Sequence, residues 1–198
     1  AAHELRTPLA VLRAQWDVVR ATTDVAERRQ AEARLGAGLD RIDRLVTQML
    51  ALSRVEATDH LPRRTAIDWT TLVAQVMNDV LALAERRRIE LACDGLAEGA
   101  PAFALQGDPD LLAALLRNLM DNAVRYAPEG STVGLRFGAN GLEVANDGPP
   151  MPAEALARLG ERFHRVDGQA ESGSGLGVSI AQRIAALHGL RLRYRAGA

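Results

Sequence analysis

The sequence is poor in cysteine, in long apolar runs and in excess charge of either sign. Cys93 is the only cysteine among 198 residues, which excludes a disulfide within the chain and a cysteine-rich metal site. Lys and Arg number 24 against 25 Asp and Glu, so no basic excess favours nucleic acid as a partner. No run of about 18 apolar residues is present, so we expect no membrane span, and no signal peptide is recognisable. A reduced, cytosolic setting is the simplest interpretation.

Apolar residues are plentiful, at 47% of the chain, which is enough for one ordinary domain or two small ones. The patterning changes along the chain and predicts two domains. We expect a helical hairpin over residues 1–56, a polar linker over 57–66 and a mixed α/β domain over 67–198. The abrupt start of the chain suggests a piece of a longer protein.

The first domain carries two series of apolar residues spaced alternately by four and three positions. The first series is Leu5, Leu9, Leu12, Trp16 and Val19, and the second is Leu35, Leu39, Ile42, Val46 and Met49. This heptad spacing predicts two antiparallel helices, separated by the polar stretch 22–30. Such a pair has little core of its own. A dimeric four-helix bundle would bury both stripes, and a monomeric hairpin packed on the neighbouring domain is the alternative.

The second domain mixes helix and strand signals. Asp68 and Asp108 stand where each caps a helix, the second with Pro109 at its first position. The expected elements are helices from Asp68 to about Arg87, from Asp108 to about Tyr126 and over 178–188, strands over 88–93, 103–106 and 190–195, and a hairpin of 132–137 with 141–146.

The stretch HELRTPLA, residues 3–10, places polar residues on the outer side of the first helix. If Leu5 and Leu9 face the core, His3 and Thr7 face outward, one turn apart. An exposed imidazole titrates near neutral pH and is nucleophilic. A carboxylate such as Glu4, bound to one ring N–H, raises the basicity of the other ring nitrogen. The alternative is that His3 is an exposed histidine with no catalytic role.

A second constellation lies on the helix that follows Asp108. Asn118, Asn122, Arg125 and Tyr126 share one face of a helix otherwise rich in Leu and Ala. The amides can offer oxygen to Mg²⁺ and N–H groups to phosphate, and the guanidinium adds positive charge. The aromatic ring can pack on a base or a ribose. A merely solvated polar face is the alternative.

Two turns complete the pattern. GSGLG puts Gly173, Gly175 and Gly177 directly before a helix, where glycines let backbone N–H groups approach phosphates. NDGPPMP, residues 146–152, follows a strand, where a polar side chain can read an adenine edge. Each motif alone is a weak signal.

The order of these motifs closely resembles that of the sensor histidine kinases of bacterial two-component systems. HELRTPL on a hairpin helix is followed by the double-Asn helix, the NDGP turn, ERFHR and GSGLG, so the resemblance covers essentially the whole chain. It implies an antiparallel helical hairpin that forms a dimeric four-helix bundle, followed by an α/β sandwich that binds ATP.

The resemblance also implies roles for the hairpin residues. His3 is similar to the family's phosphoacceptor, and Glu4 to the acidic neighbour that assists proton transfer. Thr7 is similar to the residue that positions a water for phosphatase action on the partner.

For the ATP-binding domain, the resemblance implies a nucleotide site around Mg²⁺. Asn118 matches the Mg²⁺-binding Asn, Asn122 a phosphate-contacting Asn, Arg125 a phosphate-contacting cation and Tyr126 an aromatic residue that lines the nucleotide. Arg162 and Phe163 match the box that anchors the ATP lid. The lid glycines at the phosphates correspond to Gly173, Gly175 and Gly177, with Leu176 between the last two.

The base-reading turn departs from the family pattern D-x-G-x-G. Aligned on the following prolines, the family's Asp corresponds to Asn146, and Asp147 is shifted by one position. Pro150 stands where the pattern has its second glycine, two residues after Gly148. An amide both accepts and donates, so it can pair with the adenine amine and a ring nitrogen. We therefore expect Asn146, rather than Asp147, to read the base.

The implied activity is autophosphorylation of His3 from ATP with Mg²⁺, then transfer to an aspartate on a response-regulator receiver domain, with dephosphorylation of that partner. The resemblance further implies a homodimer, and a cytoplasmic portion of a bacterial inner-membrane sensor that does not itself touch the membrane. Two alternatives remain. One is an ATPase clamp like the chaperone and mismatch-repair relatives, and the other is a non-catalytic docking module with a dead nucleotide site.

Overall fold

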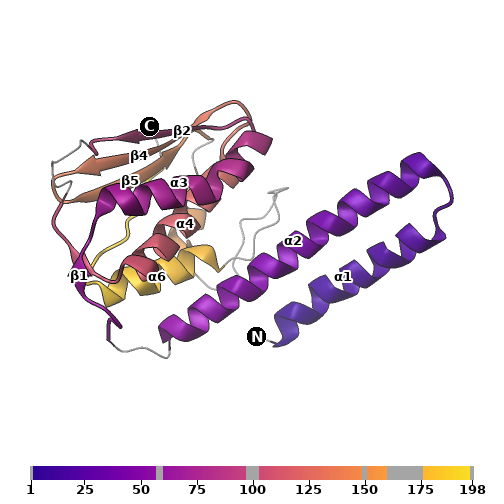
Figure 1. Ribbon diagram of the computed structural model, residues 1–198, viewed down its shortest axis with the longest axis horizontal. Helices are drawn as coiled ribbons and strands as arrows, with labels where there is room; N and C mark the ends of the chain where they lie inside the picture. Colours follow the sequence, from indigo (N-terminus) through magenta and orange to yellow (C-terminus); the bar gives the residue numbers. More distant parts are fainter. Residues whose placement is uncertain (1, 57–59, 97–102, 149–150, 160–175, 197–198) are drawn as a thin grey trace.

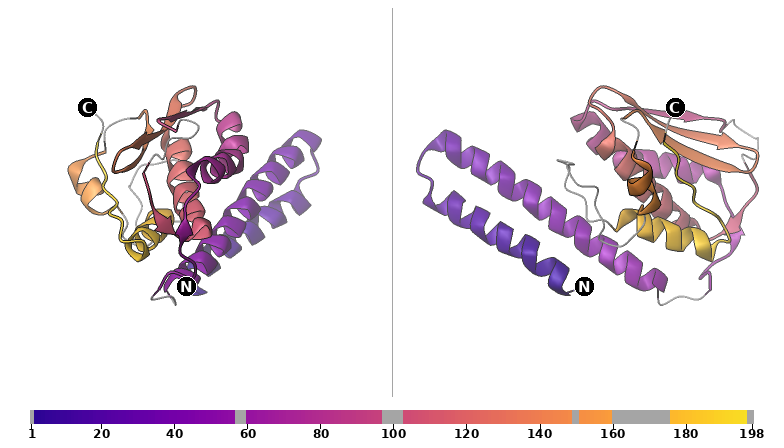
Figure 2. Two further views of the ribbon diagram at one scale, coloured as in Figure 1. Left: turned by 60° about the vertical axis from the view of Figure 1, so that its left-hand side comes forward. Right: turned by 180° about the vertical axis from the view of Figure 1, so that it is seen from behind.

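The computed structural model describes residues 2–56, 60–96, 103–148, 151–159 and 176–196, to which every structural statement below is confined. A hairpin of two long helices, α1 (Ala2–Ala21) and α2 (Val25–Glu56), leads into an α/β domain (Figure 1). Seen from behind, the loop end of the hairpin points away from that domain (Figure 2). The predicted fold class, a helical hairpin followed by an α/β domain, is confirmed.

Within the described residues, no helix combines the length and the apolar character that crossing a membrane requires.

The turn of the hairpin is much shorter than the polar stretch 22–30 suggests, because α2 already begins at Val25. Asp24 caps this helix. Its carboxylate oxygen Oδ1 accepts hydrogen bonds of 2.9 Å from the backbone N–H groups of Ala26 and Glu27. A good cap stabilises these polar first turns, so most of the polar stretch 22–30 belongs to α2.

A glycine fixes the close approach of the two helices. A Cβ atom at Gly38 would lie 2.6 Å from Cδ2 of Leu12 and 2.8 Å from Oε1 of Gln15. The helices run antiparallel, so this register places His3 level with about residues 47–50 of α2.

The hairpin buries only part of its apolar stripes. Val19 is buried, and Leu12 and Ile42 are half-buried. The stripe positions that stay between 37% and 53% exposed are Leu9, Trp16, Leu39 and Val46. They are spaced by seven residues within each helix and so form one line on each.

The α/β domain has two layers, a sheet and the helices that cover one of its faces (Figure 1). Its elements are β1 (Thr65–Ala66), α3 (Trp69–Arg86), β2 (Glu90–Asp94), β3 (Gln106–Gly107), α4 (Pro109–Tyr126), β4 (Thr132–Gly138), β5 (Gly141–Asn146), α5 (Ala153–Ala157) and α6 (Gly177–Leu187). The main sheet has the order β2-β4-β5, with β2 parallel to β4 and β4 antiparallel to β5. Because α4 lies between the parallel strands in sequence, it is the crossover helix that returns the chain to the sheet.

The core fixes which way α4 faces. Leu112, Leu116, Met120 and Val124 follow one another at intervals of four and are fully buried. They pack in one cluster with residues of β4 and α6, including Val133. Because this side of α4 is buried in the core, the polar residues of the helix lie on another side.

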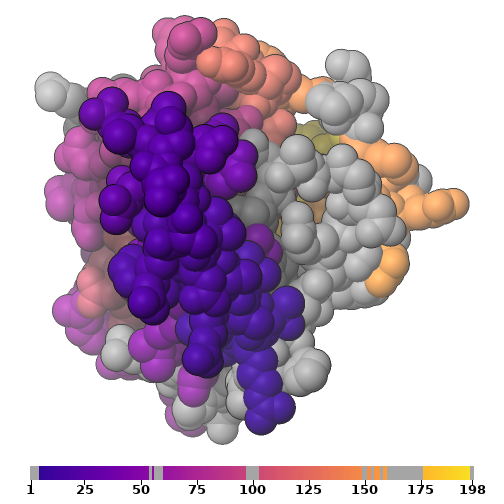
Figure 3. All heavy atoms as spheres, turned by 90° about the vertical axis from the view of Figure 1, so that its right-hand side faces the viewer, coloured from indigo at the N-terminus to yellow at the C-terminus, as the bar shows by residue number. Residues whose placement is uncertain are grey.

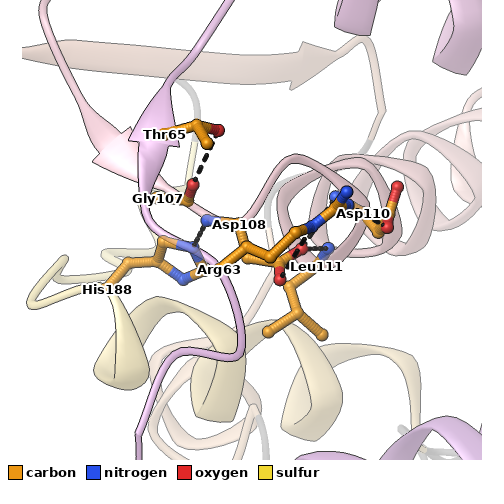
Figure 4. A network of polar contacts seen from close by, with 7 residues as sticks. All are labelled: Arg63, Thr65, Gly107, Asp108, Asp110, Leu111 and His188. Atoms are coloured by element: carbon orange, nitrogen blue, oxygen red, sulfur yellow. Dashed lines mark hydrogen bonds and ion pairs between the residues drawn. The ribbon is translucent and has the colours of Figure 1, made fainter.

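The start of α4 is held by a buried carboxylate. Oδ1 of Asp108 accepts hydrogen bonds from the N–H groups of Asp110 and Leu111, at 3.0 and 3.1 Å (Figure 4). The N–H group of Asp108 donates to Nε2 of His188 at 3.0 Å, and Nδ1 of His188 lies 2.8 Å from the carbonyl of Ile184. These partners place the ring proton on Nδ1, so His188 is a structural link between the end of α6 and the start of α4.

The linker is fastened to the same corner. Arg63 pairs with Asp110 and lies 3.9 Å from Oδ2 of Asp108 (Figure 4). Directly after it, β1 pairs antiparallel with β3. The end of the predicted linker is therefore part of the α/β domain surface.

Residues 190–196 form no strand, contrary to the prediction from their alternating pattern. The alternation itself is kept, because Leu192 and Tyr194 are half-buried while Arg193 and Arg195 are exposed. Arg195 reaches Glu143 of β5 at 2.8 Å. The segment thus lies along the sheet through side chains without a backbone ladder, which a side-chain pattern alone does not reveal.

Candidate functional site

The polar face of α4 is ordered by hydrogen bonds. Nδ2 of Asn118 donates to the carbonyl of Ala114 at 2.8 Å, which turns the amide oxygen Oδ1 away from the backbone of α4. That oxygen accepts a hydrogen bond of 3.1 Å from Nε2 of Gln48 on α2. Asn118 and Asn122 are both half-buried. The amide oxygen is therefore oriented toward the hairpin and toward the start of α6.

Arg125 is held by a carboxylate one turn before it. Its Nε and a terminal nitrogen donate to the two oxygens of Asp121 at 2.7 and 3.0 Å, and only 12% of its side chain is exposed. Arg44 of α2 approaches the same pair. Burial lowers the pKa of Arg44, and the charge of Arg125 lowers it further while Asp121 acts in the opposite direction. The Asp121 carboxylate therefore fixes the direction of the Arg125 guanidinium.

The start of α6 lies against the two amides of α4. A Cβ atom at Gly177 would lie 3.1 Å from Oδ1 of Asn118 and 3.6 Å from Nδ2 of Asn122, so a glycine permits this approach. Leu176 just before it is fully buried, and its carbonyl accepts a hydrogen bond of 2.8 Å from Oγ of Ser179. Among the residues that the structure describes, none caps α6 with its side chain. Its first N–H groups and its positive dipole end therefore face this polar corner, which suits an anion.

The turn after β5 borders the other end of the α4 face. Nδ2 of Asn146 donates to the carbonyl of Asp147 at 3.2 Å. A Cβ atom at Gly148 would lie 3.3 Å from Nδ2 of Asn146 and 3.7 Å from the carbonyl oxygen of Tyr126. Asn146 and Asp147 are both exposed. The structure therefore brings the turn, the α4 face and the start of α6 together from distant parts of the sequence.

The remaining predicted site residues divide into two groups. Thr7 is exposed on α1, as predicted, and His3 and Glu4 lie in the same helix. The other residues, Pro150, Arg162, Phe163, Gly173 and Gly175, lie outside the described residues.

Sequence reasoning missed two members of this site. Asp121 carries a local signal, since an acid four residues before Arg125 predicts an ion pair on a helix. Gln48 carries none, because it lies 70 residues from Asn118 and on the other domain.

The site offers oxygen ligands rather than a preformed metal cage. Within the described residues, no three His, Cys, Asp or Glu side chains converge as metal ligands. The Asn118 amide oxygen suits Mg²⁺, which takes one or two protein oxygens and completes its shell with water and substrate phosphates. The donor chemistry therefore fits a Mg²⁺ ion that arrives with a nucleotide.

Comparison with known proteins finds two family models, which match separate parts of the chain. Residues 1–58 match the family model of the His Kinase A (phospho-acceptor) domain, and residues 107–198 match that of histidine kinase-, DNA gyrase B- and HSP90-like ATPases. The solved cytoplasmic segment of histidine kinase QseC is 32% identical, with a TM-score of 0.50, over 76% of this chain and 80% of that one. The chain belongs to the sensor histidine kinases. The second match implies that this histidine kinase binds ATP.

Curated relatives extend the match to nearly all of this histidine kinase chain. The sensor protein QseC of Escherichia coli K12 is 43% identical over 195 residues, which are 98% of this chain and 43% of the relative. The swarming motility regulation sensor protein RssA of Serratia marcescens is 34% identical over 202 residues, covering 100% of this chain and 42% of that protein. The chain thus spans about two fifths of the length of these relatives. A solved full-length ShkA in complex with AMPPNP is 28% identical over 94% of this chain, with a TM-score of 0.62.

Proposed function

We propose that this histidine kinase core transfers the γ-phosphoryl group of ATP to His3 and from there to an aspartate of a response-regulator receiver domain. The observation that carries the proposal is the meeting of Asn118 and Asn122 with the start of α6, in a chain whose first helix bears HELRTPL. An amide pair beside a helix N-terminus suits a Mg²⁺-bound polyphosphate.

Each group near the phosphates has a distinct task. When bound, ATP with Mg²⁺ supplies the phosphoryl group. The Asn118 oxygen holds the metal, Asn122 and the first N–H groups of α6 bind phosphate oxygens, and Arg125 neutralises charge. Tyr126 lines the nucleotide. The lid residues Arg162, Phe163, Gly173, Gly175, Leu176 and Gly177 complete the enclosure.

On the hairpin, His3 accepts the phosphoryl group on a ring nitrogen. Glu4 binds the opposite ring N–H and so raises the nucleophilicity of that nitrogen. Thr7 lies one turn further along the exposed side and positions a water for dephosphorylation of the response regulator. The same surface therefore serves both transfer to the partner and removal from it.

Incubation with γ-labelled ATP and Mg²⁺ tests the proposal. We expect the protein to acquire a label that acid removes and alkali does not, as a phosphorylated imidazole does. Release of labelled inorganic phosphate without a labelled protein would indicate an ATPase clamp instead. Absence of nucleotide binding would indicate a docking module.

We expect Asn146 to read the adenine base. Asn146→Ala should weaken nucleotide binding about tenfold, because the hydrogen bonds of the amide with the base edge are lost. Asp147→Ala, the matched change at the next position, should alter the affinity less than about twofold. Titration calorimetry with a non-hydrolysable ATP analogue measures both. A larger loss from Asp147→Ala would reverse the assignment.

We propose that the exposed stripe residues of the hairpin pair with those of a second copy. Leu39→Glu should convert a dimer to a monomer, because it places a charge in the middle of the stripe without disturbing a buried position. Leu81→Glu is the control, since Leu81 is 45% exposed and belongs to α3 rather than to the hairpin. Light scattering after size exclusion measures the mass. A monomeric wild type, or a dimeric Leu39→Glu variant, would contradict the four-helix bundle.

We further propose that the whole protein is a membrane-anchored sensor of which this chain is the cytoplasmic portion. The share of QseC that the chain matches supports this, because more than half of that sensor protein lies outside the match.

A further inference from the structure

The second hairpin helix reaches into the nucleotide site. Leu45, Leu52 and Val55 of α2 are buried in the same apolar cluster as the core of the α/β domain, and Met49 packs against it. In the space-filling view, the hairpin lies across this face of the domain (Figure 3). Gln48 lies on the same side of α2, between the residues that dock.

Gln48 is hydrogen-bonded to the Asn118 oxygen that we assign to the Mg²⁺ of the nucleotide. Its Nε2 donates to Oδ1 of Asn118 at 3.1 Å, and a Cβ atom at Gly177 would lie 3.5 Å from the same nitrogen. The amide of Gln48 therefore fills the space between Asn118 and the start of α6. A Mg²⁺ ion ligated by Asn118 needs a metal–oxygen distance of about 2.1 Å and brings phosphates with it into that same space.

The amide N–H of Gln48, whose hydrogen carries a partial positive charge, and a divalent cation both bind to the same oxygen of Asn118. Close together they repel each other, so the two arrangements compete rather than reinforce each other. The charge of Arg44 on α2 also interacts with the charges of Arg125 and Asp121 on α4.

We propose that the Gln48–Asn118 hydrogen bond is an autoinhibitory latch that holds the α/β domain on the hairpin and blocks loading of Mg²⁺ with ATP. This inference rests on the role proposed above for Asn118. Because coupling between two binding events is reciprocal, nucleotide loading opens the latch and releases the domain from α2. His3 lies level with about residues 47–50 of α2, so release occurs beside the histidine that accepts the phosphoryl group.

Affinity for a non-hydrolysable ATP analogue tests the latch without relying on catalysis. Gln48→Met keeps the length and helix propensity of the side chain but removes the donor. We expect it to bind the analogue roughly threefold to tenfold more tightly than wild type in Mg²⁺, the range of one lost neutral hydrogen bond. The gain should shrink when EDTA replaces Mg²⁺. It should also vanish in the Asn118→Ala background, where the latch has no acceptor.

Gln30→Met is the matched control, because Gln30 is exposed on the same helix outside the docked part, and its affinity should equal that of wild type. Gln48→Ala repeats the test with a smaller side chain, and far-UV circular dichroism verifies that each variant is folded. Unchanged or weaker binding by both Gln48 variants would overturn the latch but leave the kinase assignment intact. A folded wild type that binds no nucleotide would instead overturn the site itself, and the latch with it.

Discussion

Replacing His3 with glutamine is expected to abolish the acid-labile label that γ-labelled ATP leaves on the protein. Glutamine preserves the helix but has no ring nitrogen that can attack phosphorus, so the loss should exceed about a hundredfold. Nucleotide affinity should stay at the wild-type level, because the residues assigned to the nucleotide lie on α4, α6 and the turn after β5. Labelling and binding measured on the same preparation separate the two effects.

His60→Gln is the matched control for this experiment. His60 is exposed in the linker, so the variant should be labelled as wild type is. Labelling that survives in His3→Gln and disappears in His60→Gln would move the phosphoacceptor to the linker. Labelling that is normal in both variants would exclude both histidines as the phosphoacceptor.

Replacing Asn118 with alanine is expected to reduce kcat/KM for autophosphorylation by about a hundredfold or more. The variant lacks the amide oxygen assigned to Mg²⁺, and charge stabilisation of this kind is commonly worth two to three orders of magnitude, about 10²–10³ in rate. Asn118→Asp retains an oxygen in place and should recover part of the rate. Initial rates over a range of Mg²⁺ concentrations measure both variants.

Asn78→Ala is the control, because Asn78 is an exposed residue of the same type on α3. Its rates and Mg²⁺ dependence should match those of wild type. Asn118 also bonds to Ala114 and Gln48, so thermal unfolding must accompany the rates. A folded Asn118→Ala variant with normal Mg²⁺ dependence would exclude this side chain as a metal ligand.

Features set by neighbouring residues could be predicted from the sequence. Asp68 and Asp108 were predicted as caps, and each accepts hydrogen bonds from N–H groups two or three residues ahead. The β4–β5 hairpin and the long apolar face of α4 follow equally local rules of turn chemistry and periodicity. Such features need no knowledge of what the element later packs against.

Features set by distant contacts could not be predicted. The side-chain pattern of residues 190–195 is that of a strand, yet whether a backbone ladder forms depends on the partner. The contact of Gln48 with Asn118 joins two domains, and no periodicity relates the two positions. The influence of Arg44 on the charges of Arg125 and Asp121 likewise crosses from one domain to the other.

The anchoring of the linker has a consequence for the reach of the α/β domain. Since Arg63 and β1 are fixed to that domain, only about seven residues after Glu56 connect it to the hairpin, a span of at most roughly 25 Å. The 32 residues of α2 measure about 48 Å along the helix axis. The linker therefore keeps the α/β domain near the His3 end of the hairpin and away from its loop end. A linker of this length gives the nucleotide site an effective concentration in the millimolar range relative to the histidine. Their encounter therefore does not depend on how much of the protein a cell contains.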